Sequence, residues 1–293
     1  MITNWLDRNI KWVFMLPALL FIALMVAYPI FYTARLSFFE WSMSAVNPSK
    51  WIGLDNYITL LKGKEFWDAL WITFYHSSIS IVLETILGVA IAILFSRKMA
   101  GAKTIKTMMM LPMVATPVSI GLVWLLIYEP SIGLANQLLK QLGFETQEWL
   151  GSVTQVMPSL ILVDVWQWTP MIALITIAGI ATIPSDPYES ASVDGANAWQ
   201  KFFHITLPLL MPTILTAVTL RMIDLVKTFD TIYATTQGGP NFASQTLNLM
   251  IFDTAFSRFQ FGYASALLMV FFIILIVIVL LLTAIRKRLG GLE

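Results

Sequence analysis

Six apolar segments, each long enough to cross a lipid bilayer, constrain the fold of this chain more than any other feature of its sequence. A helix needs about 20 residues to cross a hydrocarbon layer of about 30 Å. Charged residues make up only 12% of the chain, which fits lipid rather than water as its surroundings. We therefore predict an all-α integral membrane protein, a six-span transmembrane helical bundle that forms one domain over residues 1–293. The predicted spans are residues 12–36, 69–95, 105–128, 156–180, 209–232 and 261–285.

Lysine and arginine residues gather on one side of this arrangement. They precede the first span, fill the connection after the second and follow the last. These residues are Arg8, Lys11, Arg97, Lys98, Lys103, Lys106, Arg286, Lys287 and Arg288. The positive-inside rule then places both termini and the connections 96–104 and 181–208 in the cytoplasm. The connections 39–68, 129–155 and 234–260 face outward.

The cytoplasmic connection at residues 184–208 reads as two short helices separated by a turn. Ser185 or Asp186 caps the first helix, and Gly195 permits the turn. The small residues Ala191, Ala196 and Ala198 keep its surface shallow, while bulky apolar contacts are offered by Tyr188, Trp199 and Phe202. This pattern fits docking in a groove of another protein, and it also fits a helix lying on lipid headgroups. Amphipathicity alone does not separate the two interpretations.

The spacing of a motif in this connection favours docking. Glu189, Ser190 and Ala191 are followed by Asp194, Gly195 and Ala196, and then by Ile205-x-Leu207-Pro208. This motif resembles the EAA loop of ATP-binding-cassette importer permeases, with Ser190 in place of the second residue of Glu-Ala-Ala. Further stretches resemble the carbohydrate permeases of the maltose and glycerol-phosphate type. They include Gly53-Leu54-Asp55-Asn56-Tyr57, Leu111-Pro112, Trp149-Leu150, Gly238-Gly239-Pro240 and Phe261-Gly262-Tyr263-Ala264.

The resemblance implies a function and a set of partners. It implies a binding-protein-dependent importer of the bacterial cytoplasmic (inner) membrane that moves a sugar, polyol or oligosaccharide by alternating access. The residues from Glu189 to Ala196 would be the coupling helix that enters a cleft of the ATPase. The expected partners are a second homologous permease, two ATP-binding subunits, an extracytoplasmic solute-binding protein and membrane lipid, with no nucleic acid. ATP and Mg would bind those partner subunits, and this chain would carry no cofactor.

Charged residues inside the fifth span indicate a polar interior. An intramembrane charge costs at least about 2.5 kcal/mol, so such residues should face protein or water. One helical stripe carries Arg221, Asp224, Leu225 and Thr228, and the fourth span carries Asp164, Trp168 and Met171 at similar spacing. At 1.5 Å per residue, Trp168 and Arg221 lie at the same depth of about 18 Å. Lys227 and Asp230 lie on another side of the fifth span and are placed to pair with each other.

Two interpretations of these stripes remain open. Carboxylates, a guanidinium, a hydroxyl and an indole face suit a polyhydroxylated solute, and the resemblance implies that these positions line its site. Alternatively, Asp164, Arg221 and Asp224 form an ion-pair network that fixes helix packing. For His76 and Glu84 in the second span we expect local hydrogen bonds.

Other function classes are less well supported. An ion-coupled secondary transporter is the alternative, because intramembrane carboxylates also form proton relays. The chain has no His-Glu-x-x-His motif, no Gly-x-Ser-x-Gly motif and no phosphate-binding loop. We therefore expect no catalytic residue, no metal site and no ATP hydrolysis by this chain alone.

Overall fold

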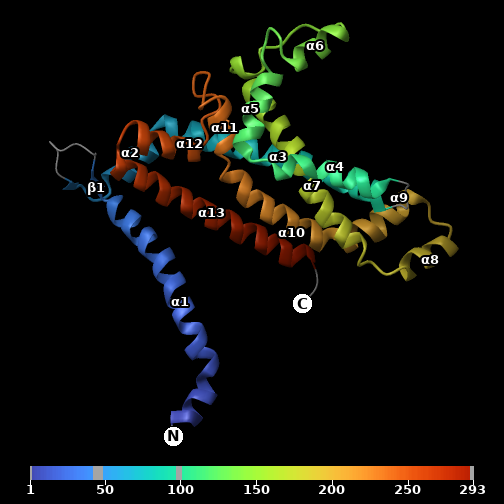
Figure 1. Ribbon diagram of the computed structural model, residues 1–293, viewed down its shortest axis with the longest axis horizontal. Coiled ribbons are helices and arrows are strands. Elements are labelled where there is room, and N and C mark those ends of the chain that lie inside the picture. The colour runs from blue at the N-terminus through green and yellow to red at the C-terminus, as the bar shows by residue number, and fades with distance from the viewer. Residues whose placement is uncertain (1, 42–48, 97–100, 291–293) are drawn as a thin grey trace. The chain divides into compact units, whose positions relative to one another are not determined.

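The computed structural model describes residues 2–41, 49–96 and 101–290, which are mostly helical and contain almost no strand (Figure 1). Arg97 and Lys98 of the predicted basic turn lie outside the described residues, as does the side chain of Arg8. Five helices of the described part are long and apolar enough to cross a membrane, or six if one bent pair counts as a single span. The prediction of an all-α membrane bundle is confirmed.

The chain forms two compact units. Unit 1 contains Met1–Lys64 and Ile251–Ile273, and unit 2 contains Glu65–Met250 and Ile274–Glu293. The elements of unit 1 are α1 (Ile2–Leu36), the paired strands β1 (Phe39–Glu40) and β2 (Lys50–Trp51), α2 (Asp55–Lys62), a short π-helix (Asp253–Ser257) and the first part of α13 (Phe261–Gly290). The amide of Asn56 ties α2 to the preceding segment by donating to the backbone oxygens of Ser37 and Phe39, at 2.8 and 3.0 Å.

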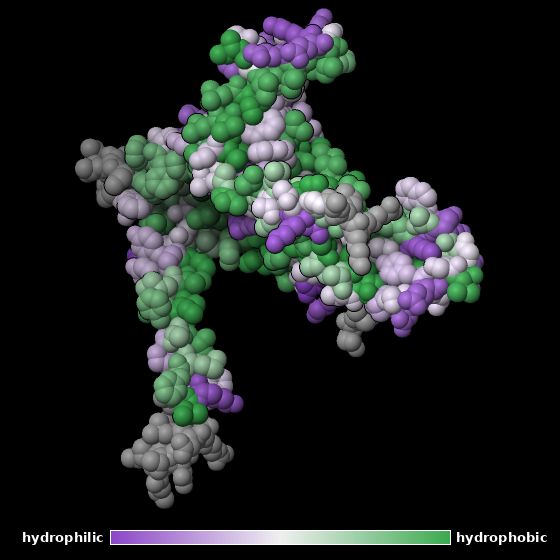
Figure 2. Space-filling model, turned by 45° about the vertical axis from the view of Figure 1, so that its right-hand side comes forward, coloured by the Kyte–Doolittle hydropathy of each residue, from purple (hydrophilic) through white to green (hydrophobic). Residues whose placement is uncertain are grey.

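Unit 2 holds the remaining elements and the end of α13. They are α3 (Lys64–Ser96), α4 (Ala102–Val114), α5 (Pro117–Ile127), α6 (Leu134–Gln141), a 3₁₀ turn at Trp149–Gly151, α7 (Val156–Ile180), α8 (Asp186–Val193), α9 (Ala198–Lys201), a short π-helix (Phe202–Thr206), α10 (Leu207–Val226), α11 (Asp230–Thr235) and α12 (Leu247–Phe252). Polar residues gather at its α6 and α8 ends, with apolar surface between them (Figure 2). This distribution fits a chain that crosses a bilayer.

Helix α7 is the central helix of unit 2, and glycines bring its neighbours close. A Cβ atom on Gly179 of α7 would lie 2.8 Å from the side chain of Thr213 on α10. A Cβ atom on Gly88 of α3 would lie 2.9 Å from Ile172 of α7. Because only glycine fits at these two crossings, α3 and α10 pack directly on α7.

The predicted span at 105–128 is wrong as a single helix. It divides into α4 and α5, which meet at an angle of 97°. Ala115 and Thr116 between them are extended, with ψ values of 146° and 144°. Pro117 disfavours helical backbone at Thr116, whose hydroxyl then accepts from the Ser119 backbone N–H and caps α5.

The predicted fifth span, 209–232, is also wrong at its outward end. Helix α10 stops at Val226, and α11 begins only at Asp230. Thr228 therefore lies beyond the helix that was expected to carry it. Its hydroxyl still donates to the Asp224 carbonyl oxygen, at 3.4 Å.

Candidate solute cavity and coupling loop

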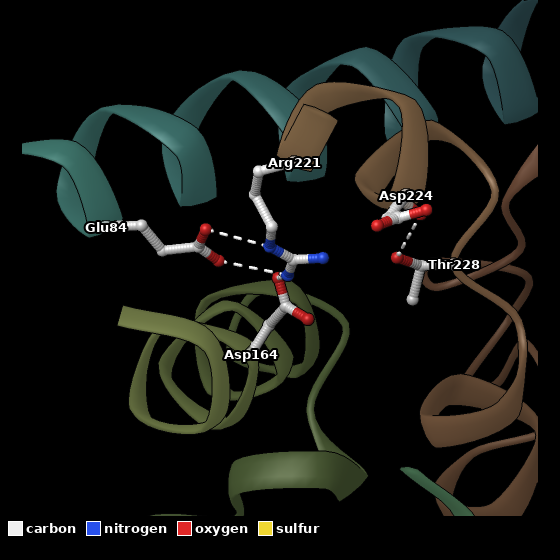
Figure 3. A network of polar contacts seen from close by, with 5 residues as sticks. All are labelled: Glu84, Asp164, Arg221, Asp224 and Thr228. Carbon is white, nitrogen blue, oxygen red and sulfur yellow. Dashed lines mark hydrogen bonds and ion pairs between the residues drawn. The ribbon is translucent and has the colours of Figure 1, made fainter. Parts of the chain in front are cut away.

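The side chain of Arg221 joins three helices in the interior of unit 2. Its Nε and Nη2 donate to the two carboxylate oxygens of Glu84 on α3, at 2.9 and 3.0 Å. Nη2 also donates to Oδ2 of Asp164 on α7, at 2.6 Å. All three side chains are buried, with Arg221 2% exposed and Glu84 fully covered. This network ties α3, α7 and α10 together (Figure 3).

Asp224 is not part of that network, which corrects the membership predicted from the sequence. The partner of the Asp224 carboxylate is Lys227, at 3.4 Å, and both side chains are about half exposed. Lys227 therefore does not form the predicted pair with Asp230, which instead starts α11. The carboxylate that sequence analysis missed is Glu84, for which only a local hydrogen bond was expected.

The indole of Trp168 lies under the guanidinium of Arg221, whose carbon is 4.9 Å from the ring centroid. A cation over an aromatic face is attracted by the ring quadrupole. In Figure 3 the remaining nitrogen of Arg221 points away from Glu84, toward the side on which Asp224 and Thr228 lie. One edge of the guanidinium is therefore bound by Glu84, and another edge points toward the side of Asp224 and Thr228.

That edge borders a cavity of about 240 Å³ beside the C-terminal end of α10. Five of the seven predicted solute-site residues line it, namely Asp164, Trp168, Arg221, Asp224 and Thr228. Lys227 and Asp230 line it as well. Carboxylates, cations, a hydroxyl and an indole thus meet in one partly open space.

Met171 and Leu225 do not line this cavity. Leu225 is 1% exposed and packs with Ile81 and Ile172 in an apolar cluster. Helical spacing placed Leu225 on the stripe of Arg221, but the neighbouring helices α3 and α7 cover its side of α10. Met171 is half-buried farther along α7.

The inner face of α3 is polar over three turns. Thr73, His76, Ser77, Ser80 and Glu84 follow helical spacing, and each is at most 2% exposed. The hydroxyls of Ser77 and Ser80 have no hydrogen-bond partner in the described part of the chain. Buried polar groups of this kind commonly bind ordered water, so the interior of unit 2 beside α3 is suited to hold water.

The predicted cytoplasmic loop contains the helices α8 and α9 with a turn between them. Gly195 has a φ of 78°, a value that favours glycine. Asn197 and Gln200 form a capping box that starts α9, a signal that sequence analysis overlooked. The hydroxyls of Tyr188 and Thr206 lie 2.9 Å apart and join the two arms.

The two arms of this loop expose bulky apolar side chains. Val193 and Trp199 are 89% and 71% exposed, and Trp199 stacks on Phe203 with ring centroids 5.8 Å apart. Tyr188 and Phe202, which were expected to offer contacts, are half-buried. Glu189 and Ser190 lie on α8 in the exposed part of the loop.

A protein-family model described as "Binding-protein-dependent transport system inner membrane component" matches residues 84–291. The chain belongs to this family. It is therefore a multi-pass permease subunit of an inner-membrane ABC importer, and ATP hydrolysis is the work of its partner subunits. The resemblance recognised around Glu189 and Gly195 is thereby confirmed, and the secondary-transporter alternative is not favoured.

Individual relatives of this permease have similar lengths. A probable ABC transporter permease of Sinorhizobium fredii is 37% identical over 255 residues, covering 87% of this chain and 82% of the relative. The trehalose/maltose transport system permease of Thermococcus litoralis is 32% identical over 247 residues, covering 84% and 83%. A solved bacterial ABC transporter involved in alginate import matches with a TM-score of 0.84 at 22% identity, covering 98% of both chains, which shows the same fold.

Proposed function

We propose that this permease carries a sugar, polyol or oligosaccharide through the cavity between α7 and α10. The cavity around Trp168 carries the proposal, because it combines an aromatic face with several hydrogen-bonding groups. Aromatic rings cover the C–H faces of sugars, while carboxylates and hydroxyls bond to sugar hydroxyls. Relatives support a carbohydrate: the Thermococcus litoralis permease belongs to a trehalose/maltose transport system, and a permease of Agrobacterium fabrum that is 33% identical over 269 residues belongs to a sulfoquinovosyl glycerol transport system.

We assign two roles to the polar residues at this cavity and behind it. Trp168, Asp224 and Thr228 face the cavity and are at least partly exposed, so we assign them solute contact. Glu84 is fully covered and holds Arg221, so its role is to position that guanidinium. Arg221 and Asp164 belong to both groups, because they line the cavity and are tied by the network.

We further propose that the loop from Glu189 to Ala196 transmits the work of ATP hydrolysis. Exposed side chains on both arms, together with the turn at Gly195, form a surface that fits a partner's cleft. Closure of two ATPases around ATP would rock this permease and a second, homologous permease to an outward-facing state. A solute-binding protein would release solute there, with both termini of this chain in the cytoplasm.

A reconstituted complex tests this proposal. One copy of this chain, one second permease and two ATPases should show ATP hydrolysis that rises with the solute-loaded binding protein. The purified chain alone should bind no ATP. ATP hydrolysis by the chain alone would contradict the proposed function. So would a complex whose ATPase activity is the same with and without the solute-loaded binding protein.

A further inference from the structure

A second cavity, of about 320 Å³, lies between the first turns of α3 and the loop after α11. It shares no residue with the cavity around Trp168. Its polar and aromatic lining consists of Glu65, Asp68, Trp71, Asn241, Phe242 and Gln245. Both carboxylates precede the predicted apolar span that begins at residue 69, so they lie on the aqueous side of it.

The loop that covers this cavity is held in one conformation by its own contacts. The hydroxyl of Ser244 donates to the Gly239 carbonyl oxygen at 2.7 Å and lies 2.8 Å from that of Thr236. Asn241 and Phe242 both have positive φ values, 48° and 60°, which non-glycine residues rarely adopt. Such strain persists only where the surroundings impose it, and here it holds the Phe242 ring 63% exposed.

Gln245 is an independent indication of a ligand. Its side chain lines the cavity although the residue is only 7% exposed. No hydrogen bond joins its carboxamide to any residue that the structure describes. Because buried polar side chains are nearly always hydrogen-bonded, this carboxamide is suited to bind a polar group that enters from outside the chain.

The chemistry of the lining selects a cation. Asp68, Glu65 and the amide oxygen of Gln245 accept hydrogen bonds, and none of the described lining residues is basic. The rings of Trp71 and Phe242 are 68% and 63% exposed, and aromatic faces attract cations. The volume lies at the lower end of the range for small-molecule pockets, about 300–1,000 Å³, which suits a single long side chain.

We propose that this cavity receives a lysine or arginine side chain of the extracytoplasmic solute-binding protein. The inference rests on the proposed function, which places this end of unit 2 outside the cell. Exposed aromatic residues beside a pocket are common among the few positions that dominate a protein interface. The pair Asp68 with Gln245 would form the pocket, and Phe242 would pack on the stem of the entering side chain.

The test measures how much solute-loaded binding protein gives half-maximal ATPase activity of the reconstituted complex. Asp68→Lys should raise that concentration by about tenfold or more, because a like charge would then face the entering cation. Glu145→Lys is the matched control, since Glu145 is an exposed acid on the same side that does not line the cavity. Basal ATPase activity should be unchanged in both variants. Gln245→Leu should weaken binding without changing net charge.

Each other outcome overturns the proposal in a recognisable way. Equal half-maximal concentrations for Asp68→Lys and Glu145→Lys would show that the cavity takes no cation of the binding protein. Loss of the second permease from the Asp68→Lys complex would assign the cavity to that subunit. If the effect of Asp68→Lys on the half-maximal concentration appears in vesicles with ethanolamine headgroups but not in vesicles with choline headgroups, the cavity binds lipid. If the ATPase activity of the wild-type complex does not rise with the binding protein, the proposed function itself is wrong.

Discussion

The guanidinium of Arg221 meets the carboxylate of Glu84 through two parallel hydrogen bonds, at 2.9 and 3.0 Å, across 137 positions of sequence. Two-point pairing of this kind fixes geometry as well as charge. It holds α10 against α3, while Asp164 adds α7 to the same contact. The proposed solute cavity lies on the other side of Arg221, so the packing of the bundle and the shape of that cavity both depend on this side chain.

Glu84→Gln should therefore destabilise the permease. The amide oxygen of Gln can still accept one hydrogen bond from Arg221, and Asp164 still pairs with Arg221. The amide NH2 is a donor, however, so the second hydrogen bond of Arg221 to this position is lost, which costs about 1–3 kcal/mol. We expect a lower yield of folded protein and a lower melting temperature of the purified complex. Asp253→Asn is the control, because it breaks an exposed pair with Arg258 and should cost at most about 1 kcal/mol. Similar melting temperatures for the two variants would contradict the role assigned to Glu84.

Replacing the whole network with apolar residues separates packing from solute contact. In the triple variant Glu84→Leu, Asp164→Leu and Arg221→Met no charge remains unpaired, and such replacements are often neutral for stability. We expect assembly to recover relative to Glu84→Gln, while uptake of the solute stays impaired. A triple variant that takes up solute with wild-type affinity would remove Arg221 and Asp164 from the solute site.

Changes at the cavity surface should affect affinity rather than folding. Asp224→Asn and Trp168→Ala should each raise the solute concentration for half-maximal uptake by about tenfold, since one lost contact is worth about 1–1.5 kcal/mol. Complex assembly and basal ATPase activity should stay normal. Trp168→Phe keeps an aromatic face and should recover most of the affinity. If Trp168→Phe and Trp168→Ala behave alike, the ring does not contact the solute.

Two glycines of equal conformation test the coupling loop. Gly195 and Gly143 have φ values of 78° and 81°, and a Cβ atom on either would meet nothing within 4 Å. Valine at each position therefore imposes the same local strain, about 1–3 kcal/mol. Only Gly195→Val, on the proposed docking surface, should lower ATP-driven uptake or loosen the ATPase subunits. Equal effects of Gly143→Val on both measurements would mean that strain alone explains the result.

The amino-acid sequence predicted the helices of this fold better than their breaks. Apolar length identified the spans, and the positive φ required at the turn was predictable from Gly195. The bend before Pro117 was missed because mean hydropathy over a long window stays high across a break in the helix. Thr116 followed by Pro117 is nevertheless a signal that one helix ends and another begins. The end of α10 at Val226 has no comparable signal, since Lys227 and Thr228 continue the helical spacing.

Contacts between helices were the part that local spacing could not supply. Spacing within one helix places Arg221 and Leu225 on a common stripe, but it does not say which helix covers each of them. In the structure α3 supplies Glu84 to one and Ile81 to the other. That pairing depends on how α3 is rotated and shifted against α10. Close packing at Gly88 and Gly179 sets this register, and it appears only when the helices are assembled.

In the proposed transport cycle, the cavity beside α10 opens alternately to the two sides of the membrane. The chain has no cysteine, so Thr228→Cys provides a single thiol in that cavity once the cysteines of the partner subunits are replaced. A membrane-impermeant maleimide measures its exposure, and Thr146→Cys, in an exposed loop on the outward side, is the control. We predict that Cys at 228 reacts from outside only when ATP is trapped in the ATPases, and from the cytoplasmic side only without nucleotide, whereas the control reacts from outside in both states. Labelling at 228 that is the same in both states would rule out alternating access of this cavity.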